Sequence, residues 1–151
     1  AVADVAERYG CPVWMGADEA HRLTDPARMP AGQEVRPWQV DRELVGDERF
    51  ELAGIPFQTV RVPGHSPAHL AFASGSDLFS GDVLFAGSVG RTDLVGGDWP
   101  TLERSIGLLL DTFPAETAVH PGHGPSTTLG QELATNPFLR ELRAARQGAA
   151  Q

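Results

Sequence analysis

Two short histidine-bearing segments constrain this chain more than any other part of its sequence. They read Pro63-Gly-His-Ser-Pro-Ala-His69 and His120-Pro-Gly-His-Gly-Pro125, and together they hold four of the five histidines. The first follows the apolar run 59–62, and the second follows 118–119. Because their prolines and glycines disfavour a helix, each segment is expected to be a fixed loop at the end of a strand. Imidazoles held in this way at a sheet edge are suited to a metal site.

A third segment adds a carboxylate to the two histidine loops. Leu78-Phe-Ser-Gly-Asp82 reads as a strand that ends in Gly-Asp, so Asp82 is expected at the same kind of edge. Imidazole and carboxylate groups are the ligands of catalytic Zn, Mn or Fe, which keep one position open for water. A single loop histidine is more often a hydrogen-bonding residue than a ligand. The spacing alone therefore leaves a metal site and a structural role both open.

Composition excludes several other classes of function. The 151 residues carry 12 basic against 20 acidic side chains, a net charge of −8, which argues against a nucleic-acid-binding surface. Every basic residue is Arg, so a lysine Schiff base and a Walker-type phosphate loop are excluded. No apolar run approaches the ~20 residues needed to cross a bilayer, so no membrane partner is expected.

Cysteine use and the N-terminal residues bear on the compartment. Cys11 is the single cysteine, so an internal disulfide is excluded. The N-terminal residues show no basic-then-apolar signal. We therefore expect a cytoplasmic protein.

The order of the expected elements is typical of an α/β fold with helices covering a mixed, mainly antiparallel sheet. Helices are expected over 1–9, 18–23 (capped by Asp18), 100–113 and 137–146, and also after the capping box of Thr128 and Gln131. Strands are expected over 11–15, 49–52, 57–62, 68–73, 78–80 and 118–120, with a polar connection over 24–42 and a loop over 86–98. No linker divides the chain, so a single domain over 1–151 is expected.

Five motifs in order make the chain recognisable. They are Val62–His69, Leu78–Asp82, Gly90-Arg-Thr-Asp93 with Gly96-Gly-Asp98, His120–Pro125 and Asn136-Pro-Phe-Leu139. Together they resemble the metallo-β-lactamase superfamily, in its glyoxalase II-like (hydroxyacylglutathione hydrolase-like) branch. The resemblance covers essentially the whole chain. It implies an αββα sandwich with a two-metal site between the sheet edges.

The resemblance implies roles for three residues at that site. His65 would be a terminal ligand of the first metal, and His123 a terminal ligand of the second. Asp82 would bridge the two metals and act as the catalytic residue. The implied cofactors are two divalent metal ions, zinc in the first place, with iron or manganese as alternatives.

The remaining motif residues receive other roles. His69 and His120 match positions that are not ligands in the family, so a structural role is expected, and His21 is expected to be solvated. Arg91 either pairs with Asp93 or binds an anionic substrate group, and the structural role is favoured slightly. Arg140 and Arg143 are further candidates for contact with an anionic substrate.

The implied reaction is hydrolysis of a small-molecule thioester, in which a metal-bridging hydroxide attacks the carbonyl and a thiolate leaves. Three alternatives stay open. A persulfide dioxygenase-like iron enzyme and a lactonase are enzymes on the same fold. A non-catalytic remnant or partner subunit belongs to a different class of function.

The chain departs from the family in one respect. The diagnostic motif His-x-His-x-Asp-His is absent, and so is the strand that a crossover into the first helix requires. We therefore expect an N-terminally truncated member, the C-terminal portion of the domain. Each metal keeps two protein ligands, below the three of a catalytic zinc, so metals should bind poorly and the chain alone should be inactive. Exposed apolar sheet should be covered by self-association, a swapped element or the missing segment.

Overall fold

The computed structural model describes residues 2–25 and 36–149. The chain divides into two compact units, residues 1–46 and 47–151, and each is described here by itself. The expectation of a single domain over 1–151 stays a prediction. Among the described helices, none has the length and apolar character needed to span a bilayer.

Within residues 2–25 and 36–46, the N-terminal unit has three helical segments and a parallel strand pair. Helix α1 (Val2–Tyr9) ends at Gly10, whose φ of 61° suits a glycine, as expected. Strand β1 (Trp14–Gly16) begins three residues later than predicted. It pairs in parallel with β2 (Arg42–Leu44), which the sequence did not predict. Most of the predicted connection over 24–42 lies outside the described residues.

The helix expected over 18–23 is more irregular than predicted, because it is divided into two short segments. It consists of a 3₁₀ turn, η1 (Ala17–Glu19), followed by α2 (His21–Thr24). The expected cap at Asp18 is wrong, because Asp18 lies inside η1 and Gly16 occupies the N-cap position.

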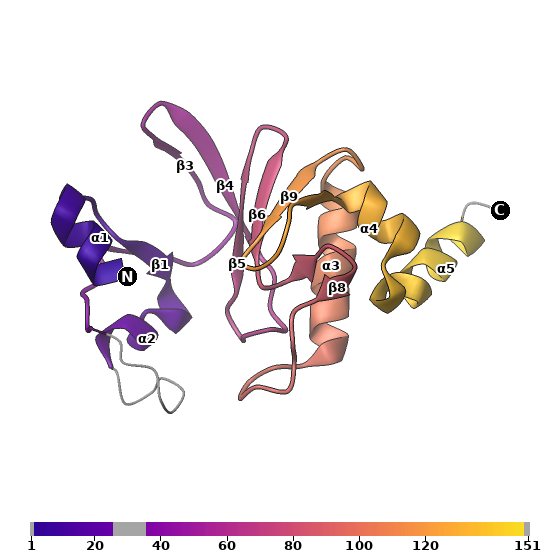
Figure 1. Ribbon diagram of the computed structural model, residues 1–151, viewed down its shortest axis with the longest axis horizontal. Coiled ribbons are helices and arrows are strands. Elements are labelled where there is room, and N and C mark those ends of the chain that lie inside the picture. Colours follow the sequence, from indigo (N-terminus) through magenta and orange to yellow (C-terminus); the bar gives the residue numbers. More distant parts are fainter. Residues whose placement is uncertain (1, 26–35, 150–151) are drawn as a thin grey trace. The chain divides into compact units, whose positions relative to one another are not determined.

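The C-terminal unit is built on a six-stranded sheet in the order β10-β9-β6-β5-β4-β3 (Figure 1). Its strands are β3 (Arg49–Leu52), β4 (Ile55–Arg61), β5 (Leu70–Ser74), β6 (Asp77–Gly81), β9 (Ala118–Pro121) and β10 (Thr127–Thr128). All neighbours are antiparallel except β6 and β9. The expected mixed, mainly antiparallel sheet is therefore confirmed. Because β6 and β9 are parallel, their carboxyl ends lie at the same edge.

One face of this sheet packs against α3 (Trp99–Thr112), which crosses from β6 to β9 (Figure 1). Alternate strand residues form the sheet side of this core and are at most 7 % exposed: Val60, Ala71, Ala73, Leu78 and Val119. The helix contributes Leu102, Ile106 and Leu109, all fully buried. The apolar stripe predicted for this helix is thus confirmed, with Leu110 and Phe113 at its margin.

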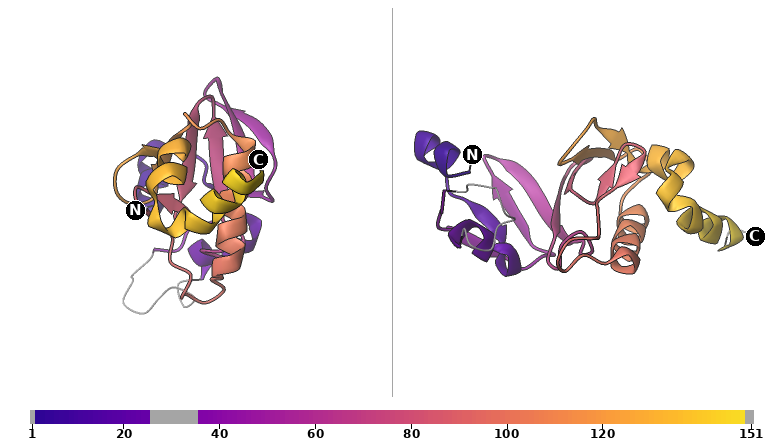
Figure 2. Two further views of the ribbon diagram at one scale, coloured as in Figure 1. Left: turned by 90° about the vertical axis from the view of Figure 1, so that its right-hand side faces the viewer. Right: turned by 60° about the horizontal axis from the view of Figure 1, so that its bottom comes forward.

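The remaining elements complete the C-terminal unit. A small hairpin of β7 (Leu84–Phe85) and β8 (Ser88–Val89) overlaps the start of the expected loop. Helix α4 (Leu129–Thr135) begins at Thr128, whose hydroxyl accepts from the Gln131 N–H, as the capping box predicts. It is followed by η3 (Pro137–Leu139) and α5 (Arg140–Ala149) at the C-terminal end (Figure 2). The helix predicted over 137–146 is therefore two segments, and the mixed α/β class is confirmed.

Candidate metal centre

Three loops at the carboxyl ends of strands bring His65, Asp82 and His123 together. Asp82 Oδ2 lies 3.6 Å from His65 Nε2 and 3.5 Å from His123 Nε2. The side chains of His65 and Asp82 are 17 % and 28 % exposed, whereas that of His123 is 79 % exposed. One oxygen of the Asp82 carboxylate thus faces the Nε2 atom of His65 on one side and the Nε2 atom of His123 on the other.

The His65 loop is anchored on the start of α3. The Asp98 N–H donates to the Gly64 carbonyl (2.8 Å), and the Ser105 hydroxyl donates to the Pro63 carbonyl (2.7 Å). Gly64 has a φ of 129°, and a Cβ there would overlap the backbone of Leu102. Only glycine therefore fits, and the loop is fixed at the two residues that precede His65.

A backbone carbonyl determines which ring nitrogen of His65 is free. His65 Nδ1 lies 2.9 Å from the carbonyl oxygen of Arg91. Because a carbonyl only accepts hydrogen bonds, Nδ1 must carry the proton. In the neutral ring, Nε2 then presents a lone pair toward Asp82, as is usual for a histidine that binds a metal.

Two glycines leave room for Asp82. A Cβ at Gly122 would overlap Asp82 Oδ1, and a Cβ at Gly90 would overlap the Asp82 carbonyl oxygen. The Gly122 N–H also donates to the Gly81 carbonyl (2.9 Å), which joins the His123 loop to the end of β6. In the sequence these glycines indicate loops, and the spacing of Gly-Asp and Pro-Gly-His does not reveal the clearance that they provide for Asp82.

Arg91 forms the structural pair that the sequence favoured. Its Nε and a terminal NH₂ donate to the two carboxylate oxygens of Asp93, both at 2.7 Å. The hydrogen bonds from Arg91 lower the pKa of Asp93 to about 2. Both side chains are exposed, so the pair orders the loop near His65 and leaves the Arg91 carbonyl for the imidazole.

His69 and His120 make hydrogen bonds away from Asp82. His69 Nε2 lies 3.1 Å from the Ser80 carbonyl oxygen. His120 contacts both Asp77 and Ser126. His21 is a half-buried residue of α2 in the N-terminal unit. The structural role expected for His69 and His120 agrees with these contacts.

The distances around Asp82 suit bound metal ions, but the set of ligands is incomplete. Two ligand atoms at about 2.1 Å from a tetrahedral ion lie about 3.4 Å apart, close to both separations from Asp82 Oδ2. The donor chemistry therefore fits a carboxylate shared between two ions. Within residues 2–25 and 36–149, however, no cluster of three or more His, Cys, Asp or Glu side chains is arranged to hold an ion.

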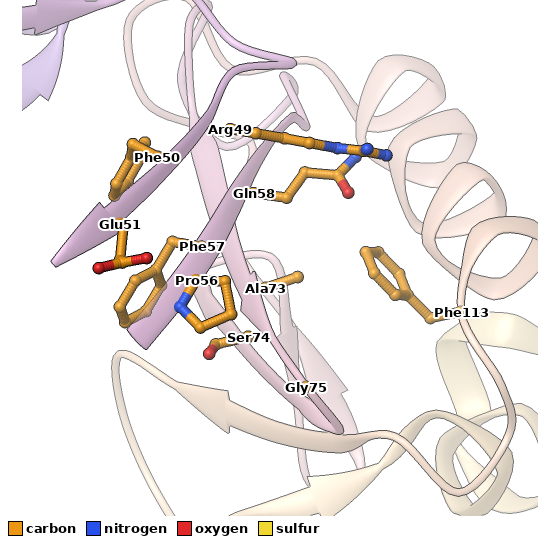
Figure 3. A pocket seen from close by; sticks show the side chains of 10 residues that line it. All are labelled: Arg49, Phe50, Glu51, Pro56, Phe57, Gln58, Ala73, Ser74, Gly75 and Phe113. Carbon is orange, nitrogen blue, oxygen red and sulfur yellow. The ribbon is translucent and has the colours of Figure 1, made fainter. Parts of the chain in front are cut away.

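A cavity of about 500 Å³ lies elsewhere on the C-terminal unit. Its lining includes Arg49, Gln58, Ala73 and Phe113, whose side chains approach from β3, β4, β5 and the end of α3 (Figure 3). Gly75, in the turn before β6, also lines it, whereas Asp82 follows the other end of that strand. The cavity is therefore separate from the candidate metal centre.

Comparison with known proteins decides the family. The family model described as "Metallo-beta-lactamase superfamily" matches residues 1–123. The chain belongs to this superfamily. Among curated superfamily relatives, it is 39 % identical over 145 residues to the probable metallo-hydrolase YqgX of Bacillus subtilis. It is 43 % identical over 147 residues to the hydroxyacylglutathione hydrolase GloC of Haemophilus influenzae. Each match covers 92 % of this chain and 69 % of the relative.

Solved structures agree on the metallo-β-lactamase fold. The BLEG-1 B3 metallo-beta-lactamase superposes with a TM-score of 0.85 at 38 % identity, covering 92 % of this chain and 70 % of that one. TTHA1623, solved in a di-iron-bound form, gives a TM-score of 0.68 at 43 % identity, covering 91 % and 70 %. The fold class expected from the sequence is thus confirmed, and divalent metal binding is a general property of the superfamily.

Proposed function

We propose that this chain contributes to a metal-dependent thioester hydrolase of the hydroxyacylglutathione hydrolase type. The observation that carries the proposal is the shared position of Asp82 Oδ2, 3.5–3.6 Å from both His65 Nε2 and His123 Nε2. His65 and His123 would each hold one ion, and Asp82 would bridge them. The 43 % identity to GloC supports the thioester as the substrate class.

The proposed chemistry assigns separate tasks to the metal and to the chain. Divalent ions, when bound, would lower the pKa of water toward neutrality and polarise the thioester carbonyl. The Asp82 carboxylate would orient the attacking water and accept its proton. The Arg91 carbonyl keeps His65 Nε2 free to bind. A thiolate is a good leaving group, so the chain needs no strong general acid.

The number of ligands limits what these three residues do alone. His65 with Asp82, and His123 with Asp82, give two protein ligands to each ion, and a catalytic zinc normally has three. Other groups must therefore complete the coordination of each ion. We propose that this chain alone binds metal weakly and has little activity. Imidazole and carboxylate favour zinc, with iron as the alternative on the example of TTHA1623.

We also propose that apolar side chains on the sheet face opposite α3 are covered in the working protein. Leu52 and its cross-strand partner Ile55 are 40 % and 50 % exposed, and Phe79 on β6 is 44 % exposed. A second copy of the chain or a further segment would remove this surface from water. Light scattering that finds a stable monomer would contradict self-association.

The test of the substrate class is a paired hydrolysis assay with added zinc. S-lactoylglutathione and the β-lactam nitrocefin are offered to the chain alone and to the chain supplemented with the part of GloC that it does not match. We expect thioester hydrolysis in the supplemented sample, little in the chain alone, and loss of activity in Asp82→Asn. Asp111→Asn is the matched control, because Asp111 is an exposed carboxylate paired with Arg146 and has no contact with the candidate metal centre. Cleavage of nitrocefin in place of the thioester would overturn the proposal.

A further inference from the structure

The loop that carries His123 is closed at its base by a side-chain contact. The loop spans residues 122–126, between the end of β9 and the start of β10. His120 precedes it and Ser126 is its last residue, and His120 Nδ1 lies 3.0 Å from Ser126 Oγ. This hydrogen bond joins the two ends of the loop.

Asp77 connects the same histidine to β6. His120 Nε2 lies 2.7 Å from Asp77 Oδ1, and Asp77 is the first residue of β6. An ionised carboxylate only accepts hydrogen bonds, so Nε2 carries the proton. In the neutral ring, Nδ1 then accepts from the Ser126 hydroxyl. The three residues thus form one directed chain from Ser126 through His120 to Asp77.

The His120 ring is also held by packing. Phe79 is the register partner of His120 on the neighbouring strand, and the two rings stack with centroids 5.1 Å apart. Rotation of the imidazole would break this stack as well as both hydrogen bonds. The ring is therefore fixed in a single orientation.

Apart from its 3.5 Å contact with Asp82 Oδ2, the His123 side chain has little to restrain it. Its side chain is 79 % exposed, and its ring meets that of Phe85 only at a centroid distance of 6.3 Å. The backbone of the loop must therefore determine where its imidazole lies. The loop is tied on one side by the Gly122 N–H to the Gly81 carbonyl, and at its base by His120 and Ser126.

We propose that Asp77, His120 and Ser126 form a loop clasp that positions His123 beside Asp82. This inference rests on the proposed function, because it gives the clasp a role in metal binding. Asp77 begins β6, and Asp82 directly follows its other end. The clasp therefore fixes the position of the His123 loop relative to the strand that leads to the shared carboxylate. His120 is thus a positioning residue.

The experiment compares Ser126→Ala and His120→Phe with the matched variant Ser126→Thr, which keeps the hydroxyl. His120→Phe keeps an aromatic ring against Phe79 and loses both hydrogen bonds. The readouts are the side-chain ¹H–¹⁵N spectrum of His123, the Co²⁺ affinity and the Tm. We expect Ser126→Ala and His120→Phe to give broadened or doubled His123 signals and about tenfold weaker Co²⁺ binding. Ser126→Thr should resemble the wild type.

A purely structural role would lower the Tm without changing the His123 spectrum. The proposal is overturned if His123 signals stay single and sharp in both disruptive variants, or if Ser126→Thr changes them equally. Absence of Co²⁺ binding in the wild type would instead refute the proposed function, and the His123 spectrum would still decide the clasp.

Discussion

At the scale of single residues, the candidate site depends on how closely backbone and carboxylate approach. Asp82 lies between two imidazoles because the positions facing it, Gly90 and Gly122, have no side chain. The His65 imidazole is oriented by a backbone carbonyl, so no side-chain substitution can remove that partner directly. We therefore expect that a single methyl group added at one of these glycines will disturb the site.

The variant Gly122→Ala adds such a methyl group beside Asp82. A Cβ at this position would overlap Asp82 Oδ1 and push the carboxylate away from His65 and His123. We expect Co²⁺ affinity to fall about tenfold, measured by titration. Gly148→Ala is the control, since a Cβ there meets no atom within 4 Å. Equal affinities in the two variants would refute the clearance argument.

At the scale of elements, helices α3 and α4 fix the His65 loop and the β7–β8 hairpin. The N-terminus of α3 holds the His65 loop through Asp98, whose side chain accepts from the Thr101 N–H (2.8 Å). Helix α4 holds the β7–β8 hairpin through Glu132, which is only 2 % exposed. Each contact stabilises a helix end and a loop at the same time.

Because Asp98 caps α3 with its carboxylate, we expect the stability of the fold to depend on pH. The hydrogen bonds from Thr101 lower the pKa of Asp98 from its ordinary value of 3.8. A lowered pKa means that the cap stabilises the fold above pH 3.8, and that this stabilisation is lost as the pH falls through the folded-state value. Asp98→Ala should lower the Tm by about 3 °C at pH 7 and by less below pH 3.8. Asp98→Asn keeps the cap, so a Tm loss as large as that of alanine would contradict the account.

We expect substitution of Glu132 to lower the stability more than substitution of Asp98. Its carboxylate accepts hydrogen bonds from the Gly87 N–H, the Thr127 hydroxyl and the Asn136 amide. Glu132→Ala leaves three donors without this acceptor, and the free energy of unfolding should fall by about 3 kcal/mol in urea titrations. Glu132→Gln keeps an acceptor oxygen and should cost less than half as much. Similar losses in both variants would show that packing, not hydrogen bonding, is decisive.

The sequence predicts the long elements well and the short ones poorly. The stripe of α3 and the cap at Thr128 carry periodic or local signals that can be read directly. By contrast, β2, β8 and β10 have two or three residues and depend on pairing with distant backbone. Similarly, the order of the motifs predicts His65, Asp82 and His123 as site residues, but the hydrogen-bond partner that orients His65 is a backbone carbonyl, which leaves no side-chain pattern.

At the scale of the whole molecule, the net charge of −8 and the number of ligands define what the chain can do. Net negative charge would not attract an anionic thioester from a distance, so recognition must be local. In the proposed metal centre, His65 and His123 would share the Asp82 carboxylate, so that each ion would receive two protein donors. The central claim is that this shared carboxylate joins the two histidines in one site.

The most direct test is a Zn²⁺ titration of the wild type and Asp82→Asn, followed through the side-chain ¹H–¹⁵N signals of His65 and His123. We expect both histidines to respond to Zn²⁺ with weak affinity in the wild type, and we expect Asp82→Asn to weaken the response of both by at least about tenfold. Two tightly held ions per isolated chain, or histidine responses that Asp82→Asn leaves unchanged, would contradict this expectation.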